Sequence, residues 1–97
     1  MEMHQIYYFL ALCEERNFTR AAQHCDVTQP SLTKAIKNLE LTLGGTLFYR
    51  SKSETRLTKL GNLVKHSMQK ISLESARVKQ VSQEYVGRMT NEASLVE

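Results

Sequence analysis

The sequence predicts a mainly α-helical fold with one small β-hairpin and a long helix after it. Glycine and proline, the residues that most often interrupt helices, number only four and one among the 97 residues. In four stretches the apolar residues recur at three- and four-residue steps, which is the period of a helix with one buried face. Residues 46–57 instead combine strand-favouring side chains at both ends with a polar centre, as hairpins do.

Two helices are expected early in the chain, over residues 2–16 and 19–25. Asn17 breaks the apolar pattern between them, as asparagine often does near helix ends. Ala21 and Ala22 are small, which allows a neighbouring helix to approach the second helix closely. The apolar face of the first helix comprises Met3, Ile6, Phe9, Leu10 and Cys13.

A third helix is expected over residues 29–43, directly after a tight connection. The hydroxyl of Thr28 can cap its N-terminus, and Pro30 lies in the first turn, where the missing N–H needs no partner. The pair Gly44 and Gly45 should end this helix. Its buried face is expected to comprise Leu32, Ile36, Leu39 and Leu43.

The rest of the chain is expected to form a hairpin at 46–57 and one long helix at 58–86. Thr58 would cap the start of this helix and Gly87 its end, and residues 88–97 show no periodicity. Three helices followed by a hairpin form a winged helix-turn-helix, in which the hairpin is the wing. The predicted units are therefore a winged helix-turn-helix domain at 1–57, a dimerisation helix at 58–87 and a hinge or tail at 88–97.

The long helix carries a seam of apolar residues at alternating four- and three-residue steps, a coiled-coil-like spacing weakened by two serines. At about 1.5 Å per residue this helix would extend about 43 Å, more than a body of this size can cover. A second copy of the chain would then cover the seam, so a homodimer is expected. The alternative is a helix that folds back on its own domain. The seam residues are Val64, Met68, Ile71, Val78 and Tyr85.

Positive charge is concentrated in the middle of the chain. The net charge is +3, but residues 34–70 alone hold eight lysines and arginines and only two glutamates. Such a stretch suits a phosphate-rich partner such as nucleic acid, although a solvated charged surface is the alternative.

The sequence lacks the signals of several other classes of protein. It has neither a signal peptide nor an apolar run that could span a membrane, so a cytoplasmic protein with no membrane partner is expected. Cys13 and Cys25 have no metal-ligand spacing and are expected to be buried thiols in a reducing compartment. The three histidines share no ligand spacing, so no metal is expected, and no catalytic motif indicates an enzyme.

Five short motifs follow one another along the chain: Phe18 to Ala22, Thr28-Gln29-Pro30, Leu39 to Gly44, Leu47 to Arg50 and Leu57 to Gly61. Together they resemble the N-terminal domain of the LysR-type transcriptional regulators, over about residues 3–86. The resemblance implies a DNA-binding domain, a linker helix that pairs with a second subunit, and a dyad-symmetric promoter site bound by a dimer or, for full-length chains, a tetramer. It also implies a C-terminal domain that binds a small-molecule effector. We expect that domain to be absent from this segment, which would then need no cofactor.

The resemblance also assigns a recognition helix, residues 29–43, to the major groove of DNA. Gln29, Pro30, Thr33 and Lys34 match the positions that contact bases in this family. The amide of Gln29 could pair with adenine and the ammonium group of Lys34 with guanine. The alternative is that all four are ordinary exposed helix residues.

Other residues match positions near the phosphate backbone or in the wing. They are Thr19, Thr28, Ser31, Lys37, Arg50, Lys52 and Arg56. Many family members have an arginine where this chain has Ser53, so either Lys52 or Arg56 takes over its role or the wing contributes less. A winged helix can also serve protein–protein contact, but the basic stretch favours DNA.

Overall fold

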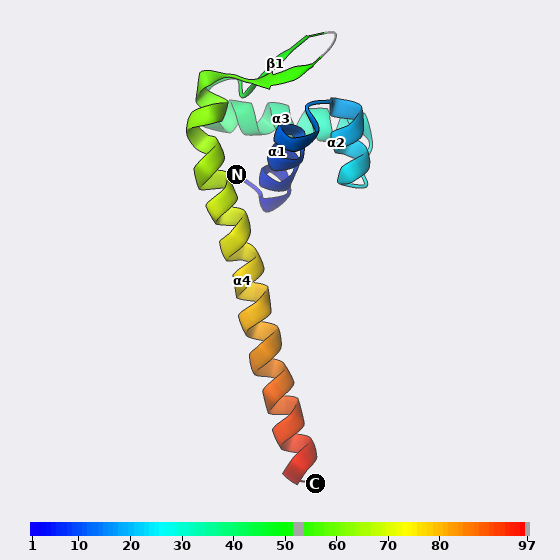
Figure 1. The fold of residues 1–97 in the computed structure, drawn as a ribbon, viewed down its shortest axis with the longest axis vertical. Coiled ribbons are helices and arrows are strands. Elements are labelled where there is room, and N and C mark those ends of the chain that lie inside the picture. The colour runs from blue at the N-terminus through cyan, green and yellow to red at the C-terminus, as the bar shows by residue number, and fades with distance from the viewer. Residues whose placement is uncertain (52–53, 97) are drawn as a thin grey trace.

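The structure is a computed structural model that describes residues 1–51 and 54–96, the last five of them by their backbone alone. Three short helices and a two-stranded hairpin form a head, and a long helix leaves this head (Figure 1). In chain order the elements are α1 (Met3–Glu15), α2 (Phe18–His24), α3 (Gln29–Leu43), β1 (Phe48–Arg50), β2 (Thr55–Leu57) and α4 (Lys59–Val96). The predicted fold class, mainly α with a winged helix-turn-helix and a long helix, is confirmed.

The core of the head lies between the three short helices and the start of the hairpin. Phe9 of α1, Leu32 of α3 and Leu47 just before β1 have no exposed surface. Ala21 and Ala22 are also buried, and their small side chains let α2 pack against both α1 and α3. The apolar faces predicted for α1 and α3 are therefore the faces that pack inward.

Polar side chains and one glycine fix the ends of the helices. The side-chain oxygen of Asn17 accepts a hydrogen bond from the backbone N–H of Arg20 at 2.8 Å and caps α2. Gly44 ends α3 with a φ of 84°, a left-handed conformation that glycine adopts without strain. Thr58 caps α4 by accepting from the N–H of Gly61 at 3.0 Å. The bounds of the three short helices lie within one residue of those predicted.

The wing is tied to the three short helices by a ring contact and by a backbone hydrogen bond. Its strands are antiparallel, with Phe48 opposite Leu57. The ring of Phe48 lies 5.4 Å from the ring of Phe9, between centroids, which anchors the hairpin to the core. The backbone N–H of Thr55 donates to the carbonyl oxygen of Arg16 at 3.1 Å, so β2 is also tied to the end of α1.

Helix α4 is longer than predicted. Its 38 residues correspond to about 57 Å at 1.5 Å per residue, and the longest dimension of the molecule is 63 Å. The predicted helix end at Gly87 and the tail after it are wrong, because α4 continues through Gly87 to Val96. A single glycine costs a helix only about 1 kcal/mol relative to alanine, and no proline follows it.

The first half of α4 belongs to the head. Met68 is 3% exposed and lies in the core cluster, and Val64 and Ile71 are half-buried against that cluster. The prediction that Met68 faces a second copy is therefore wrong: α4 packs on α1 over this stretch, and the core of the same chain covers the side chain. For this half of α4, the alternative of a helix folded back on its own domain holds.

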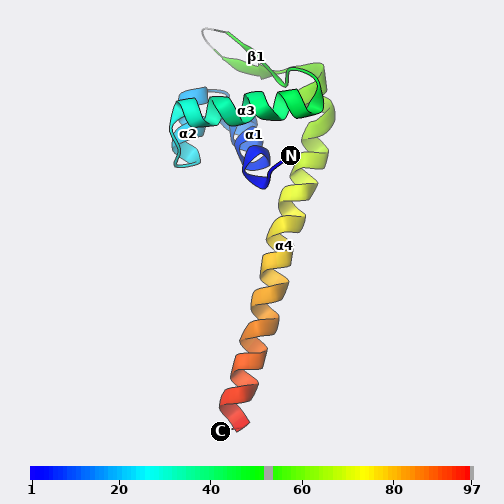
Figure 2. The ribbon, with the colours of Figure 1, turned by 180° about the vertical axis from the view of Figure 1, so that it is seen from behind.

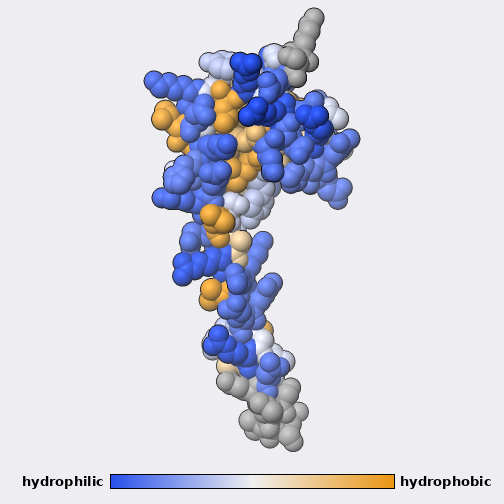
Figure 3. Space-filling model, in the orientation of Figure 1, coloured by the Kyte–Doolittle hydropathy of each residue, from blue (hydrophilic) through white to orange (hydrophobic). Residues whose placement is uncertain are grey.

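Beyond Ser75 helix α4 leaves the head, although Val78 still lines a surface hollow together with Met3 of α1, and we name residues 76–96 the shaft. The hydroxyl groups of Tyr7 in α1 and Ser75 in α4 lie 3.1 Å apart. Every side chain from residue 76 to residue 91 is exposed. Val78 and Tyr85 of the predicted seam lie in this part, with 64% and 62% of their surface exposed. Figure 3 shows apolar side chains at intervals along α4, separated by hydrophilic ones.

Candidate nucleic-acid interface

One face at the start of α3 carries the four residues predicted to contact bases. Gln29, Pro30 and Lys34 are exposed, and Thr33 is half-buried. Gln29 and Thr33, and likewise Pro30 and Lys34, are four residues apart, so the four side chains lie on one side of the helix, whereas Leu32 is buried on another face. The structure therefore brings the four residues together on the outside of the head, across which α3 runs (Figure 2).

Two hydroxyl side chains hold the first turn of α3. Thr28 Oγ1 accepts from the backbone N–H of Ser31 at 3.2 Å and donates to Ser31 Oγ at 2.8 Å. The hydroxyl of Thr28 is thus used by the helix cap, whereas the hydroxyl proton of Ser31 is not used in this pair. Thr28 and Ser31 were both predicted to lie near the DNA backbone, and Ser31 is the one whose side chain can donate to a phosphate.

Thr19, at the start of α2, lies beside Gln29, ten residues further along the chain. Thr19 Oγ1 donates a hydrogen bond to the side-chain carbonyl oxygen of Gln29, Oε1, at 3.0 Å. Both side chains are exposed. This contact was not predicted, because the sequence spacing does not give the angle at which α2 and α3 meet.

Arg50, at the end of β1, lies over the ring of Phe18 in α2. Its guanidinium carbon is 4.2 Å from the centre of that ring, a cation–π contact. A groove between the wing and the starts of α2 and α3 is lined by Thr19, Gln29 and Arg50, among others. Thr19 and Arg50, predicted near the DNA backbone, thus meet at one groove with Gln29, predicted to contact a base.

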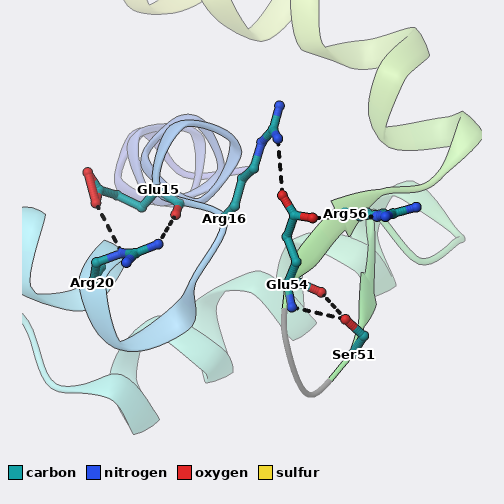
Figure 4. A network of polar contacts seen from close by, with 6 residues as sticks. All are labelled: Glu15, Arg16, Arg20, Ser51, Glu54 and Arg56. Atoms are coloured by element: carbon teal, nitrogen blue, oxygen red, sulfur yellow. Dashed lines mark hydrogen bonds and ion pairs between the residues drawn. The ribbon is translucent and has the colours of Figure 1, made fainter.

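Glu54 of the wing lies between two arginines (Figure 4). Its Oε1 is 3.0 Å from Arg16 Nη1, and its Oε2 is 3.7 Å from Arg56 Nε. The backbone N–H of Glu54 donates to Ser51 Oγ at 3.0 Å and helps to close the hairpin turn. Arg56, predicted as a cation of the wing, is therefore paired with an acid. The role of Glu54 was not predicted, because Arg16 and Glu54 are 38 residues apart in the chain.

Of two further lysines predicted near the DNA, the structure describes Lys37 but not Lys52. Lys37 is exposed on α3, one turn beyond Thr33, and extends the face that carries the predicted base contacts. Lys52 and Ser53 lie outside the described residues. The part of the wing that would reach the minor groove therefore stays a prediction.

The two cysteines are half-buried rather than buried. Burial raises the pKa of the Cys13 thiol to about 11, although nearby Lys65 opposes this effect, and burial also raises the pKa of Cys25. Both thiols are therefore neutral near pH 7 and pack as small apolar groups. Within residues 1–51 and 54–96, no cluster of three His, Cys, Asp or Glu could hold a metal ion, and no helix is long and apolar enough to cross a membrane.

Comparison with known proteins agrees with this geometry. Residues 3–62 match the family model described as bacterial regulatory helix-turn-helix protein, lysR family. The chain is 41% identical over 63 residues to the probable cat1 operon transcriptional activator of Acinetobacter lwoffii, which is 65% of this chain and 21% of that protein. It resembles the CbnR DNA-binding domain in its complex with DNA, with a TM-score of 0.82 and 31% identity over 89% of this chain and 99% of that chain. A full-length OxyR variant from Pseudomonas aeruginosa has a TM-score of 0.82 and 36% identity, over 87% of this chain and 28% of that chain.

The chain spans about a fifth of the length of the curated relatives that it matches first, and these relatives are transcriptional regulators rather than enzymes. It nevertheless covers nearly all of a separate DNA-binding domain. The family match includes all three short helices, the wing and the start of α4. The chain therefore belongs to the LysR family of bacterial regulatory helix-turn-helix proteins.

Proposed function

We propose that this chain is the sequence-specific DNA-binding part of a bacterial transcriptional regulator and that α3 enters the major groove of double-stranded DNA. The observation that carries the proposal is the exposed face at the start of α3. Gln29, Thr33 and Lys34 present an amide, a hydroxyl and an ammonium group there, on a helix whose other face is held in the core. A helix fits the major groove, where each base pair offers a distinct pattern of donors and acceptors.

Side chains around this face are suited to contact the phosphate backbone. Ser31 has a hydroxyl proton to donate, Lys37 is exposed one turn further along α3, and Arg50 lies at the neighbouring groove. Phosphate contacts of this kind position the protein, while base contacts specify the sequence. The CbnR and BenM DNA-binding domains that this chain resembles are both described in complexes with DNA, which supports the same role here.

The exposed shaft of α4 pairs with a second copy of the chain in this proposal. Val78 and Tyr85 are exposed, and Met89, half of whose surface is exposed, continues the four-residue step after Tyr85. Tyr85 and Met89 lie further along the shaft than Val78, which lines a surface hollow with Met3 of the head. Two copies joined along their shafts would hold two α3 helices at a set separation, which fits a dyad-symmetric promoter site.

Two further properties of the relatives' family are placed outside this chain in our proposal. Because the curated relatives are much longer than this chain, we propose that a small-molecule effector binds outside residues 1–97 and that any tetramer forms with the help of residues beyond them. A cytoplasmic location, where bacterial promoter DNA lies, stays a prediction.

Selection of bound duplexes from a random pool, followed by footprinting, tests the proposed function. We expect one preferred sequence with two half-sites related by a dyad, and binding that weakens steeply with salt, by a log–log slope of about −0.9 per phosphate contact. Gln29→Ala or Lys34→Ala should cost about 1–3 kcal/mol on the selected site and less on random DNA. Lys79→Ala, on the exposed shaft, is the matched control and should change neither affinity. A chain that selects no sequence, or binds with no dependence on salt, would instead favour a role in protein–protein contact.

A further inference from the structure

The hydroxyl proton of Thr19 is already in use. Thr19 Oγ1 is the donor in the 3.0 Å hydrogen bond to Gln29 Oε1. A threonine hydroxyl has a single proton, so the Thr19 side chain cannot donate to a phosphate oxygen, which is only an acceptor, while this bond exists. The contact of Thr19 with the DNA phosphate backbone, expected from the sequence, therefore competes with its hydrogen bond to Gln29.

Both ends of this hydrogen bond lie at helix starts that are held by caps. Thr19 is the second residue of α2, whose start is fixed by the bond from the Arg20 N–H to Asn17 at 2.8 Å. Gln29 is the first residue of α3, directly after the capping residue Thr28. The two backbones are thus held in place by the head, and the remaining freedom is that of the Gln29 side chain.

The hydrogen bond restricts a side chain that would otherwise rotate in solvent. Gln29 is exposed, and a free glutamine samples many rotamers, which are lost when it binds a base. The bond to Thr19 uses the carbonyl oxygen of the amide and leaves its two N–H donors out of that contact. In the major groove these donors meet acceptors at purine N7, guanine O6 and thymine O4.

We propose that Thr19 is a positioning residue that orients the amide of Gln29 and thereby sets how strongly Gln29 prefers its base pair; this rests on the proposed entry of α3 into the major groove. Thr19 thus affects how well the chain discriminates between bases at one position, and it does not affect the affinity for random DNA. A residue that only contacted phosphate would affect all sequences alike. Because Thr19 acts through Gln29, its effect disappears when the Gln29 side chain is removed.

The test measures binding of the 97-residue chain to its selected duplex, to duplexes changed at the base pair whose preference Gln29→Ala abolishes, and to random DNA. Thr19→Val keeps the branched shape and removes the hydroxyl, and Thr19→Ser keeps the hydroxyl as the matched control. Thr19→Val should lower the preference at that base pair about three- to tenfold, with the affinity for random DNA and the salt slope unchanged. Thr19→Ser should retain the wild-type preference. The double variant of Thr19→Val with Gln29→Ala should behave as Gln29→Ala alone.

Three results would overturn the inference. An equal loss on every duplex, with a salt slope smaller by about one, would show that Thr19 contacts phosphate instead. Additive effects in the double variant would show that Thr19 does not act through Gln29. An unchanged base preference in Thr19→Val would show that the hydroxyl is not needed.

A measurement without DNA separates this inference from the proposed function. Nitrogen-15 relaxation of the Gln29 side-chain amide in the free chain should report a less mobile group in the wild type and Thr19→Ser than in Thr19→Val. Equal mobility in all three would refute the orientation by Thr19, whatever DNA the chain binds. An amide held as expected in a chain that selects no DNA sequence would refute the proposed function, and with it the role of Thr19 in base preference.

Discussion

Shortening one apolar side chain in each half of α4 should separate folding from assembly. Met68 is 3% exposed within the head, whereas Val78 is 64% exposed on the shaft. Met68→Ala removes a buried side chain worth about 1.5–3 kcal/mol of burial and leaves a cavity, so the total loss should be about 2–5 kcal/mol. For a domain of this size the melting temperature should fall by about 8 °C or more. Val78→Ala shortens a largely exposed side chain, so the stability of the monomer should change by about 0.5 kcal/mol or less.

The assay is denaturant unfolding followed by circular dichroism, together with sedimentation at the same protein concentrations. At concentrations where the chain is monomeric, only Met68→Ala should lower the unfolding midpoint. At higher concentrations Val78→Ala should raise the dissociation constant of the dimer, and Lys79→Ala, the adjacent exposed control, should not. A Met68→Ala chain that loses the dimer but unfolds at the wild-type midpoint would put Met68 back in the seam. A monomeric Val78→Ala chain as unstable as Met68→Ala would mean that the shaft packs on the head.

Three other substitutions have outcomes that the structure predicts. Gly87→Ala should stabilise α4 by about 1 kcal/mol, since nothing lies within 4 Å of an added Cβ. At Gly61 the same Cβ would collide with the carbonyl oxygen of Leu47, so Gly61→Ala should destabilise the fold, because overpacking of about 1–3 kcal/mol outweighs the gain. Thermal unfolding of both variants checks these opposite signs. Glu54→Gln frees two arginines, so affinity for random DNA should rise and its salt slope should steepen by up to about two phosphate contacts; a slope that does not change in titrations would mean that neither arginine lies near DNA. Because burial raises the pKa of Cys13 from 9.0 to about 11, the neutral thiol favours the folded state; this stability is complete below pH 9 and is lost as the pH rises through about 11. The difference in unfolding free energy between the wild type and Cys13→Ala should follow that course, and a difference that stays constant from pH 8 to pH 11 would contradict it.

The elements of the head could be predicted because their signals are local. Thr28, Pro30 and Gly44 mark the two ends of α3, and the helix runs over the residues predicted, Gln29–Leu43. Gly87 gave a false signal for the end of α4. A glycine ends a helix when the backbone turns into the left-handed region, as at Gly44, but within a continuing helix its cost is small enough for the helix to pass through.

Contacts between elements could not be predicted in the same way. Met68 and Val78 belong to one apolar stripe, and periodicity shows that such side chains need a cover but not whether the head or a second copy supplies it. The pairing of Glu54 with Arg16 depends on how the wing folds back toward the end of α1, which no local pattern encodes. The candidate base contacts at the start of α3 were predictable as residues, but the orientation of Gln29 by another helix was not.

In the proposed dimer, the base preference and the spacing of the half-sites should depend on separate parts of this chain. Helix α4 is continuous from Met68 in the core of the head to Tyr85 on the exposed shaft, so the proposed dimer has no flexible joint between its two heads. The distance between two α3 helices is then set by the direction in which α4 leaves the head, which the packing of Met68 and the contact between Tyr7 and Ser75 hold. A substitution there should therefore change which separation of half-sites is bound and keep the preferred base at each position. A substitution at Thr19 should do the reverse, since in our proposal it acts on the amide of Gln29 and leaves the path of α4 unchanged.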